Sequence, residues 1–172
     1  MRRALLLLIL LSGAATAQPR YGMSSEAYEV FARWMTTTCI GDEAEQWAVK
    51  LRRHRAELAP AFQRALTDGP PDELVAEVRR AADARYAAIA AMPPAEVRIA
   101  GIAPRSTVRP ARQGYVDGEA TRYAAGYRSN AIAGLAIVGG PDARAGLGRI
   151  AGQRDNPLSA AASEALKSIP VR

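Results

Sequence analysis

Apolar residues recur at steps of three and four along most of the chain, which is the spacing of one face of an α-helix. In the first such segment, residues 24–39, Phe31 and Trp34 fall on one face, and Ser24 or Ser25 stands at the expected N-cap. The same spacing predicts further helices over residues 42–55, 60–66, 71–91, 117–138, 141–151 and 157–169. No segment alternates apolar and polar residues for long enough to predict a strand. The sequence therefore predicts an all-α protein.

The N-terminus carries a short apolar run that does not fit this amphipathic pattern. Two arginines precede the apolar residues 4–11, and the small-residue sequence A-T-A follows at residues 15–17. This order is typical of a secretory signal peptide, with cleavage after Ala17. The run is shorter than the roughly 20 apolar residues that span a bilayer, so a membrane anchor is the weaker alternative. We expect a bacterial, periplasmic or secreted mature chain with no integral membrane segment.

Positive charge is concentrated in one stretch. The formal net charge is +6 and falls to +4 when the two N-terminal arginines leave with residues 1–17. Residues 97–116 contain no acidic residue and account for the whole of that remaining excess through Arg98, Arg105, Arg109 and Arg112. Export argues against nucleic acid as the partner, and the charge favours an acidic protein or an anionic component of the envelope.

Prolines divide the mature chain into three parts. We expect a helical N-terminal region over residues 18–92, a Pro- and Arg-rich connection over residues 93–116, and a second helical region over residues 117–172. A long irregular connection inside a compact protein is usually functional or disordered. The connection is therefore a candidate site of function.

The second helical region contains an internal repeat. Residues 127–138 align with residues 158–169 at a shift of 31, and small and branched apolar residues then coincide. The matching pairs are Ala131 with Ala162, Gly134 with Ala165, Leu135 with Leu166, and Val138 with Ile169. A period of this length predicts stacked helical hairpins, and the small residues would let neighbouring helices approach closely.

The residues at the helix ends and turns of this repeat also follow a pattern. The first helix ends in a pattern formed by Leu135, Val138 and Gly139. The next helix has Leu and Ile at helical spacing, and Asp155 precedes the second copy. These features resemble a HEAT-type repeat of the short bacterial variety, over the last third of the chain. The resemblance implies a short α-solenoid whose concave face binds protein. Such repeats usually have an aliphatic residue followed by an arginine at this position. The first copy keeps the arginine, as Arg128, whereas the second copy has Leu158-Ser159, which suits a terminal cap.

The sequence offers few residues for catalysis. Cys39 is the single cysteine, so a disulfide within the chain is excluded, and its neighbours favour an inert, buried thiol. His54 is the single histidine and has only Glu57 as a nearby carboxylate, so we interpret it as a solvated residue of a helix surface. The glycines of residues 139–152 follow no predicted strand and do not form a phosphate loop. We expect no catalytic residue, no metal and no cofactor.

These observations favour a secreted, non-enzymatic helical-repeat module that binds another protein. Tyr and Arg are favoured in binding hot spots, although core packing is the alternative for the tyrosines. The candidate contact residues are Arg105, Arg109, Arg112, Arg122, Tyr123, Tyr127 and Arg128. Two other hypotheses stay open at this point. The first is a periplasmic binder of an anionic envelope lipid or polymer through the segment from Arg98 to Arg112, and the second is an enzyme-associated subunit that uses Cys39.

Overall fold

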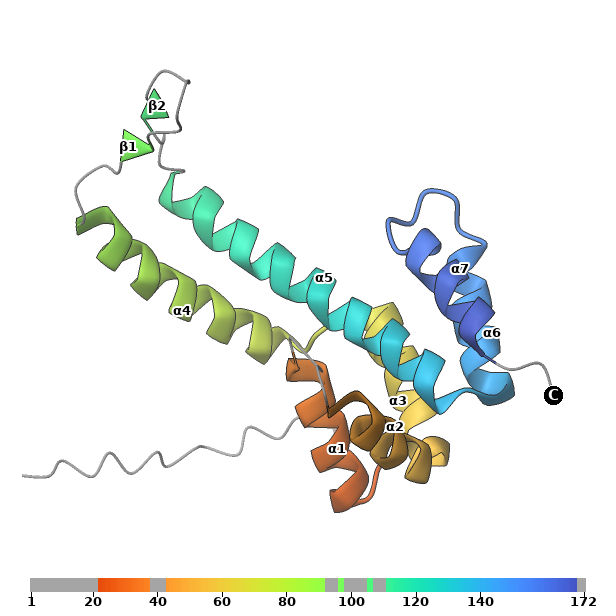
Figure 1. Ribbon diagram of the computed structural model, residues 1–172. Coiled ribbons are helices and arrows are strands. Elements are labelled where there is room, and N and C mark those ends of the chain that lie inside the picture. The colour runs from red at the N-terminus through yellow and green to blue at the C-terminus, as the bar shows by residue number, and fades with distance from the viewer. Residues whose placement is uncertain (1–21, 38–42, 92–95, 98–104, 107–110, 170–172) are drawn as a thin grey trace, which may run out of the picture.

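A computed structural model describes residues 22–37, 43–91, 96–97, 105–106 and 111–169 of the chain. Within these ranges the structure contains seven helices (Figure 1): α1 (Ser25–Thr36), α2 (Ala44–Arg53), α3 (Arg55–Asp68), α4 (Asp72–Ala91), α5 (Arg112–Val138), α6 (Gly140–Ala151) and α7 (Ser159–Ser168). The only other regular structure in the described chain is an antiparallel pair of two-residue strands, β1 (Glu96–Val97) and β2 (Arg105–Ser106). The all-α prediction is confirmed.

The long helix α5 organises the molecule, because it contacts each of the other six helices. Its C-terminal half packs with α1, α2 and α3, and with α6 and α7, to form the body of the protein (Figure 1). The body has one continuous hydrophobic core. Its largest fully buried side chains are Trp34, Phe62, Leu51, Leu58, Leu135, Leu147 and Val138.

A glycine brings α3 and α5 into close contact. A Cβ atom placed on Gly134 would lie 2.6 Å from two ring carbons of Phe62, so the aromatic ring rests directly on the backbone of α5. The prediction that small residues of the repeat allow close helix packing is therefore confirmed at Gly134. The neighbour is α3, however, and not the second copy of the repeat.

The N-terminal half of α5 and all of α4 form an antiparallel hairpin that extends away from the body (Figure 1). We call this hairpin, with the β1–β2 ladder at its tip, the arm. Among the described elements, α4 contacts α5 alone, and Ala82 is the only buried residue of α4. The arm is held by the tilted ring pair Tyr86–Tyr115, with centroids 5.6 Å apart, and by ion pairs between the two helices.

Two helices begin five residues earlier than expected. The third helix begins at Arg55 and contains Pro60, because the chain breaks at His54 and not at the proline. Helix α5 begins at Arg112, five residues before the expected start at Asp117, so the end of the connection over residues 93–116 is helical. The reason is tertiary: this extra turn packs on α4, where Arg112 pairs with Asp83 and Tyr115 meets Tyr86.

The stacked solenoid stays a prediction. Both copies of the repeat contribute to the core, since Ala131 and Ala162 are fully buried and Val138 and Ile169 are almost so. Helix α7 packs on α6 and on α5, as neighbouring hairpins would. In a solenoid each repeat contacts only its neighbours, whereas α5 also contacts α1, α2, α3 and α4.

Candidate functional site

The two candidate tyrosines lie side by side on α5, where it leaves the body. Tyr127 belongs to the buried core and is only 4% exposed. Tyr123 is half-buried and packs against it, with ring centroids 6.2 Å apart. Burial raises the pKa of Tyr123, and the charge of Glu77 adds to the rise. The placement of both rings favours core packing over a contact surface.

Three of the candidate arginines, Arg112, Arg122 and Arg128, are spread along α5 and do not converge. Arg112 forms a two-fold hydrogen-bonded ion pair with Asp83 of α4, and Arg122 pairs with Glu119 on its own helix. Arg128 lies against Gly69 at the end of α3, where an added Cβ would come within 2.6 Å of Nη2. Sixteen residues of helix separate Arg112 from Arg128, a distance of about 24 Å at 1.5 Å per residue. They therefore cannot contact one small ligand together.

The arginine-rich connection is described only in part. Arg105 belongs to β2, whereas Arg98 and Arg109 lie outside the described residues. The positive charge of Arg112 is paired with the Asp83 carboxylate, and the hydrogen bonds from this guanidinium lower the pKa of Asp83. The uninterrupted run of positive charge in the sequence is thus partly neutralised by a carboxylate on α4.

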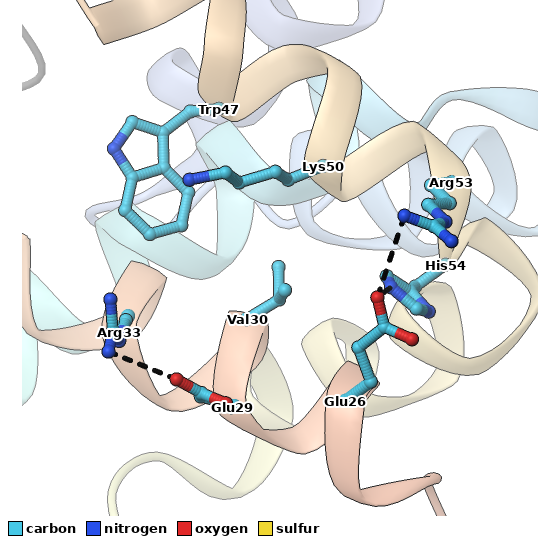
Figure 2. Close-up of a pocket in the computed structure, with 8 residues that line it drawn as sticks. All are labelled: Glu26, Glu29, Val30, Arg33, Trp47, Lys50, Arg53 and His54. Carbon is cyan, nitrogen blue, oxygen red and sulfur yellow. Dashed lines mark ion pairs between the residues drawn. The ribbon is translucent and has the colours of Figure 1, made fainter.

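A pocket of about 250 Å³ opens between α1 and α2, with His54 at one edge (Figure 2). Lys50 lies over the ring of Trp47, with Nζ 5.1 Å from the centroid, as in a cation–π contact. Ion pairs join charged residues of the pocket wall: Arg33 pairs with Glu29 on the same helix, whereas Arg53 and His54 pair with Glu26 across the opening. Because the acids and bases offset each other, the pocket presents no strong net charge to a ligand.

The surroundings of His54 overturn the interpretation of a solvated helix surface. Its side chain is only 10% exposed, and Nε2 lies 3.5 Å from Oε1 of Glu26 while Nδ1 lies 3.9 Å from Oε1 of Glu57. The residue sits at the junction of α2 and α3, where the turn directs it toward α1. Sequence spacing missed Glu26 because it belongs to another helix. In the described part of the chain, no group of three or more His, Cys, Asp or Glu side chains could hold a metal ion.

Glu57 fastens the start of α1 to α3. Its carboxylate accepts hydrogen bonds from the backbone N–H of Ser24 and from the Ser24 hydroxyl, the latter at 3.2 Å. The same hydroxyl oxygen accepts from the Ala27 amide at 3.3 Å, so the predicted N-cap at Ser24 is confirmed. The two hydrogen bonds from Ser24, with a smaller effect of His54, lower the pKa of Glu57. These contacts of Glu57 join the start of α1 to α3, which is a structural role.

Comparison with known proteins supplies no family. No family model matches the chain, no curated protein matches it, and no solved structure matches it. None of the described helices combines the length and the apolar character needed to cross a membrane. Cys39 lies outside the described residues.

Proposed function

We propose that this protein is an exported, non-enzymatic helical scaffold that binds another protein through its arm. One observation carries the proposal: α4, a helix of 20 residues, contacts only α5 among the described elements. Helices in proteins gain most of their stability by packing an apolar face, and α4 uses little of its surface in this way. The opposite surface of α4 is available to a second molecule.

The exposed surface of α4 is apolar toward the tip. Ile89 is 39% exposed, and Val49 on α2 is the only other exposed large apolar side chain among the described residues. Small side chains surround Ile89 and would allow a partner helix to approach closely. The exposed alanines of this half of the helix are Ala81, Ala84, Ala87, Ala88, Ala90 and Ala91.

The contacts within the arm suit a preformed binding element. Arg79 pairs with Asp117, Arg85 with Glu119, and Arg112 with Asp83, so ion pairs cross between α4 and α5 along the hairpin. Exposed pairs contribute little stability each, but three of them join the two helices along the length of the arm. A partner that binds a preorganised hairpin avoids the entropic cost of ordering it.

The HEAT-type resemblance and the signal-peptide pattern support the same proposal. Repeat proteins of this kind bind other proteins, and an exported chain meets its partner in the periplasm or outside the cell. No observation in the described residues favours the two alternatives. Arg112 of the arginine segment is already paired with Asp83, and Cys39 is not described.

The test compares two substitutions that place an acid on an exposed apolar position. Ile89→Asp changes the arm, and Val49→Asp makes the matched change on the body, at a side chain that is 63% exposed. Tagged mature protein is incubated with envelope extract, and captured proteins are quantified by mass spectrometry. We expect a protein that wild type and Val49→Asp capture equally and that Ile89→Asp loses at least tenfold.

The opposite pattern contradicts the proposal. Capture that survives Ile89→Asp, or that both substitutions reduce equally, places the partner elsewhere than on the arm. Far-UV circular dichroism of both variants excludes unfolding as the cause, since each substitution lies on an exposed helix face.

A further inference from the structure

A hollow of about 690 Å³ lies at the turn between α5 and α6, at the opposite end of α5 from the tip of the arm. Three arginines from three different helices line it: Arg52 of α2, Arg55 of α3 and Arg144 of α6. No carboxylate belongs to the described residues of its wall. The volume falls within the range of small-molecule sites, about 300–1,000 Å³.

Backbone carbonyls hold each arginine in place. Nε of Arg55 donates to the carbonyl of Val138 at 2.8 Å, and Nε of Arg52 donates to that of Ile137 at 3.3 Å. Nη2 of Arg144 donates to the carbonyl of Ile169 at 2.8 Å. Cationic side chains are favourable at helix C-termini, so each of these hydrogen bonds caps a helix end. Capping of separate carbonyls does not by itself require the three arginines to line the same hollow, as they do here.

The N-terminus of α6 also borders the hollow, and Asp142 in its first turn is not part of the wall. Gly139 and Gly140 have φ values of +59° and +88°, a conformation that glycine adopts without strain, and this sharp turn directs the start of α6 into the hollow. The helix has no side-chain cap at its N-terminus. A Cβ on Gly140 would lie 3.8 Å from Cζ of Arg55, so this guanidinium lies beside the uncapped turn. Helix N-termini and guanidinium groups both favour anions.

We propose that this hollow binds a phosphate monoester. Three guanidinium groups beside a helix N-terminus suit a doubly charged phosphate ligand better than a ligand with a single carboxylate. The planar guanidinium group can also donate two hydrogen bonds to phosphate oxygens. Apolar side chains, including Ile137, Pro141 and Ile169, line the wall beside the arginines and Ser168, and they would contact the organic part of the ligand. A small organic phosphate and a lipid headgroup share this chemistry. The site is separate from the arm and does not depend on the function proposed for it.

The experiment measures binding of glycerol 3-phosphate to the mature protein by isothermal titration calorimetry, with glycerol as the neutral control. Pelleting with phosphatidic acid vesicles, against phosphatidylcholine vesicles, shows whether a lipid headgroup is the better source. Saturable binding of either phosphate monoester supports the proposal, and the comparison between them identifies the source. Failure of both to bind overturns it.

Two variants assign the binding to the hollow. Arg52→Gln, Arg55→Gln and Arg144→Gln together should weaken binding at least tenfold, whereas Arg33→Gln, Arg80→Gln and Arg154→Gln together remove the same charge elsewhere and should weaken it less than twofold. Since the first triple variant also loses three helix-capping contacts, Ala136→Glu provides a second test. It places a carboxylate in the wall and keeps every arginine.

We expect Ala136→Glu to weaken phosphate binding at least tenfold and to raise the melting temperature. The new carboxylate would interact with the positive charges of the three arginines in place of the ligand. Unchanged binding in Ala136→Glu, or an equal loss in both triple variants, would show nonspecific attraction to a basic protein and refute the site. These outcomes are independent of the capture experiment on the arm, which uses Ile89 and Val49.

Discussion

Gly134→Ala tests the packing of α5 on α3, the contact that joins the two halves of the chain. The added Cβ would lie 2.6 Å from Cε2 and Cζ of Phe62 and 2.8 Å from Cε1. Such separations are far below van der Waals contact, so either the ring or the helix must move. Phe62 is fully buried and packs against Phe31, with ring centroids 5.3 Å apart, so the ring has no free space to enter.

Two effects of opposite sign determine the result. Overpacking of a core by one methyl group costs about 1–3 kcal/mol. Alanine in place of glycine inside a helix contributes about 1 kcal/mol of stability. The net loss is therefore about 1 kcal/mol, which lowers the melting temperature of a chain of this size by roughly 2–4 °C.

Gly126→Ala is the matched control for this substitution. It lies on the same helix, is exposed, and has nothing within 4 Å of an added Cβ. We expect it to stabilise the protein by up to about 1 kcal/mol, the helix-propensity effect alone. Urea unfolding followed by circular dichroism gives both free energies of unfolding, and their difference isolates the cost of the clash.

A double-mutant cycle with Phe62→Leu shows whether the ring is the cause. In the Phe62→Leu background, Gly134→Ala should cost less than in wild type, because the smaller side chain leaves room for the methyl group. If Gly134→Ala stabilises the protein as Gly126→Ala does, or if the two substitutions are additive, the packing described for α3 and α5 is wrong.

Three further predictions concern hydrogen bonds and ion pairs. The side-chain amide of Asn130 on α5 donates to the carbonyls of Met35 and Thr37 at 3.1 and 3.0 Å. Asn130→Ala should therefore lower the free energy of unfolding by about 1–2 kcal/mol. Asn130→Asp should lower it further, because a carboxylate would face the C-terminus of α1. Urea titrations of the two variants check the order, and equal stability to wild type would contradict it. Glu57 has a pKa lowered from 4.5 by its hydrogen bonds from Ser24, so its contribution to stability is present above about pH 4.5 and is lost as the pH falls through the lower folded-state value. Glu57→Gln should therefore flatten the decline of stability with acid in thermal melts between pH 5 and pH 3, and an unchanged slope would show that this group does not cause it. Arg112→Gln and Asp83→Asn should each lower the free energy of unfolding only slightly, since the pair is exposed. Their double-mutant cycle should show coupling, and strict additivity would mean that the pair does not form in solution.

Helical spacing in the sequence located most of the helices, because the faces that pack in the core recur at the helical period. The N-cap at Ser24 and the start of α6 beside Pro141 follow from local chemistry and were also predictable. The break at His54 was not, because the segment around it is polar, and Pro60 offered a more obvious interruption. The early start of α5 depends on Asp83 and Tyr86, which lie about thirty residues away in the sequence.

The candidate sites depend more strongly on tertiary structure. A tyrosine at helical spacing gives the same sequence pattern whether its side chain faces the core or a partner. The burial of Tyr127 could therefore not be predicted from the sequence. The three arginines of the α5–α6 hollow stand at positions 52, 55 and 144, and only the packing of three helices brings them together. In the sequence, by contrast, the positive charge is concentrated in residues 97–116, which predicts a site in the connection. The arm itself has no sequence signal, because its helices look like any other pair.

Site-specific photo-crosslinking from the arm tests the central proposal most directly. A photoreactive residue placed at Ile89 or, as the control, at Val49 is irradiated in the native envelope, and adducts are resolved by gel electrophoresis and mass spectrometry. Binding of a protein through the arm predicts one discrete adduct from position 89 that position 49 does not give. Absence of any protein adduct at position 89, or the same adducts from both positions, would contradict it.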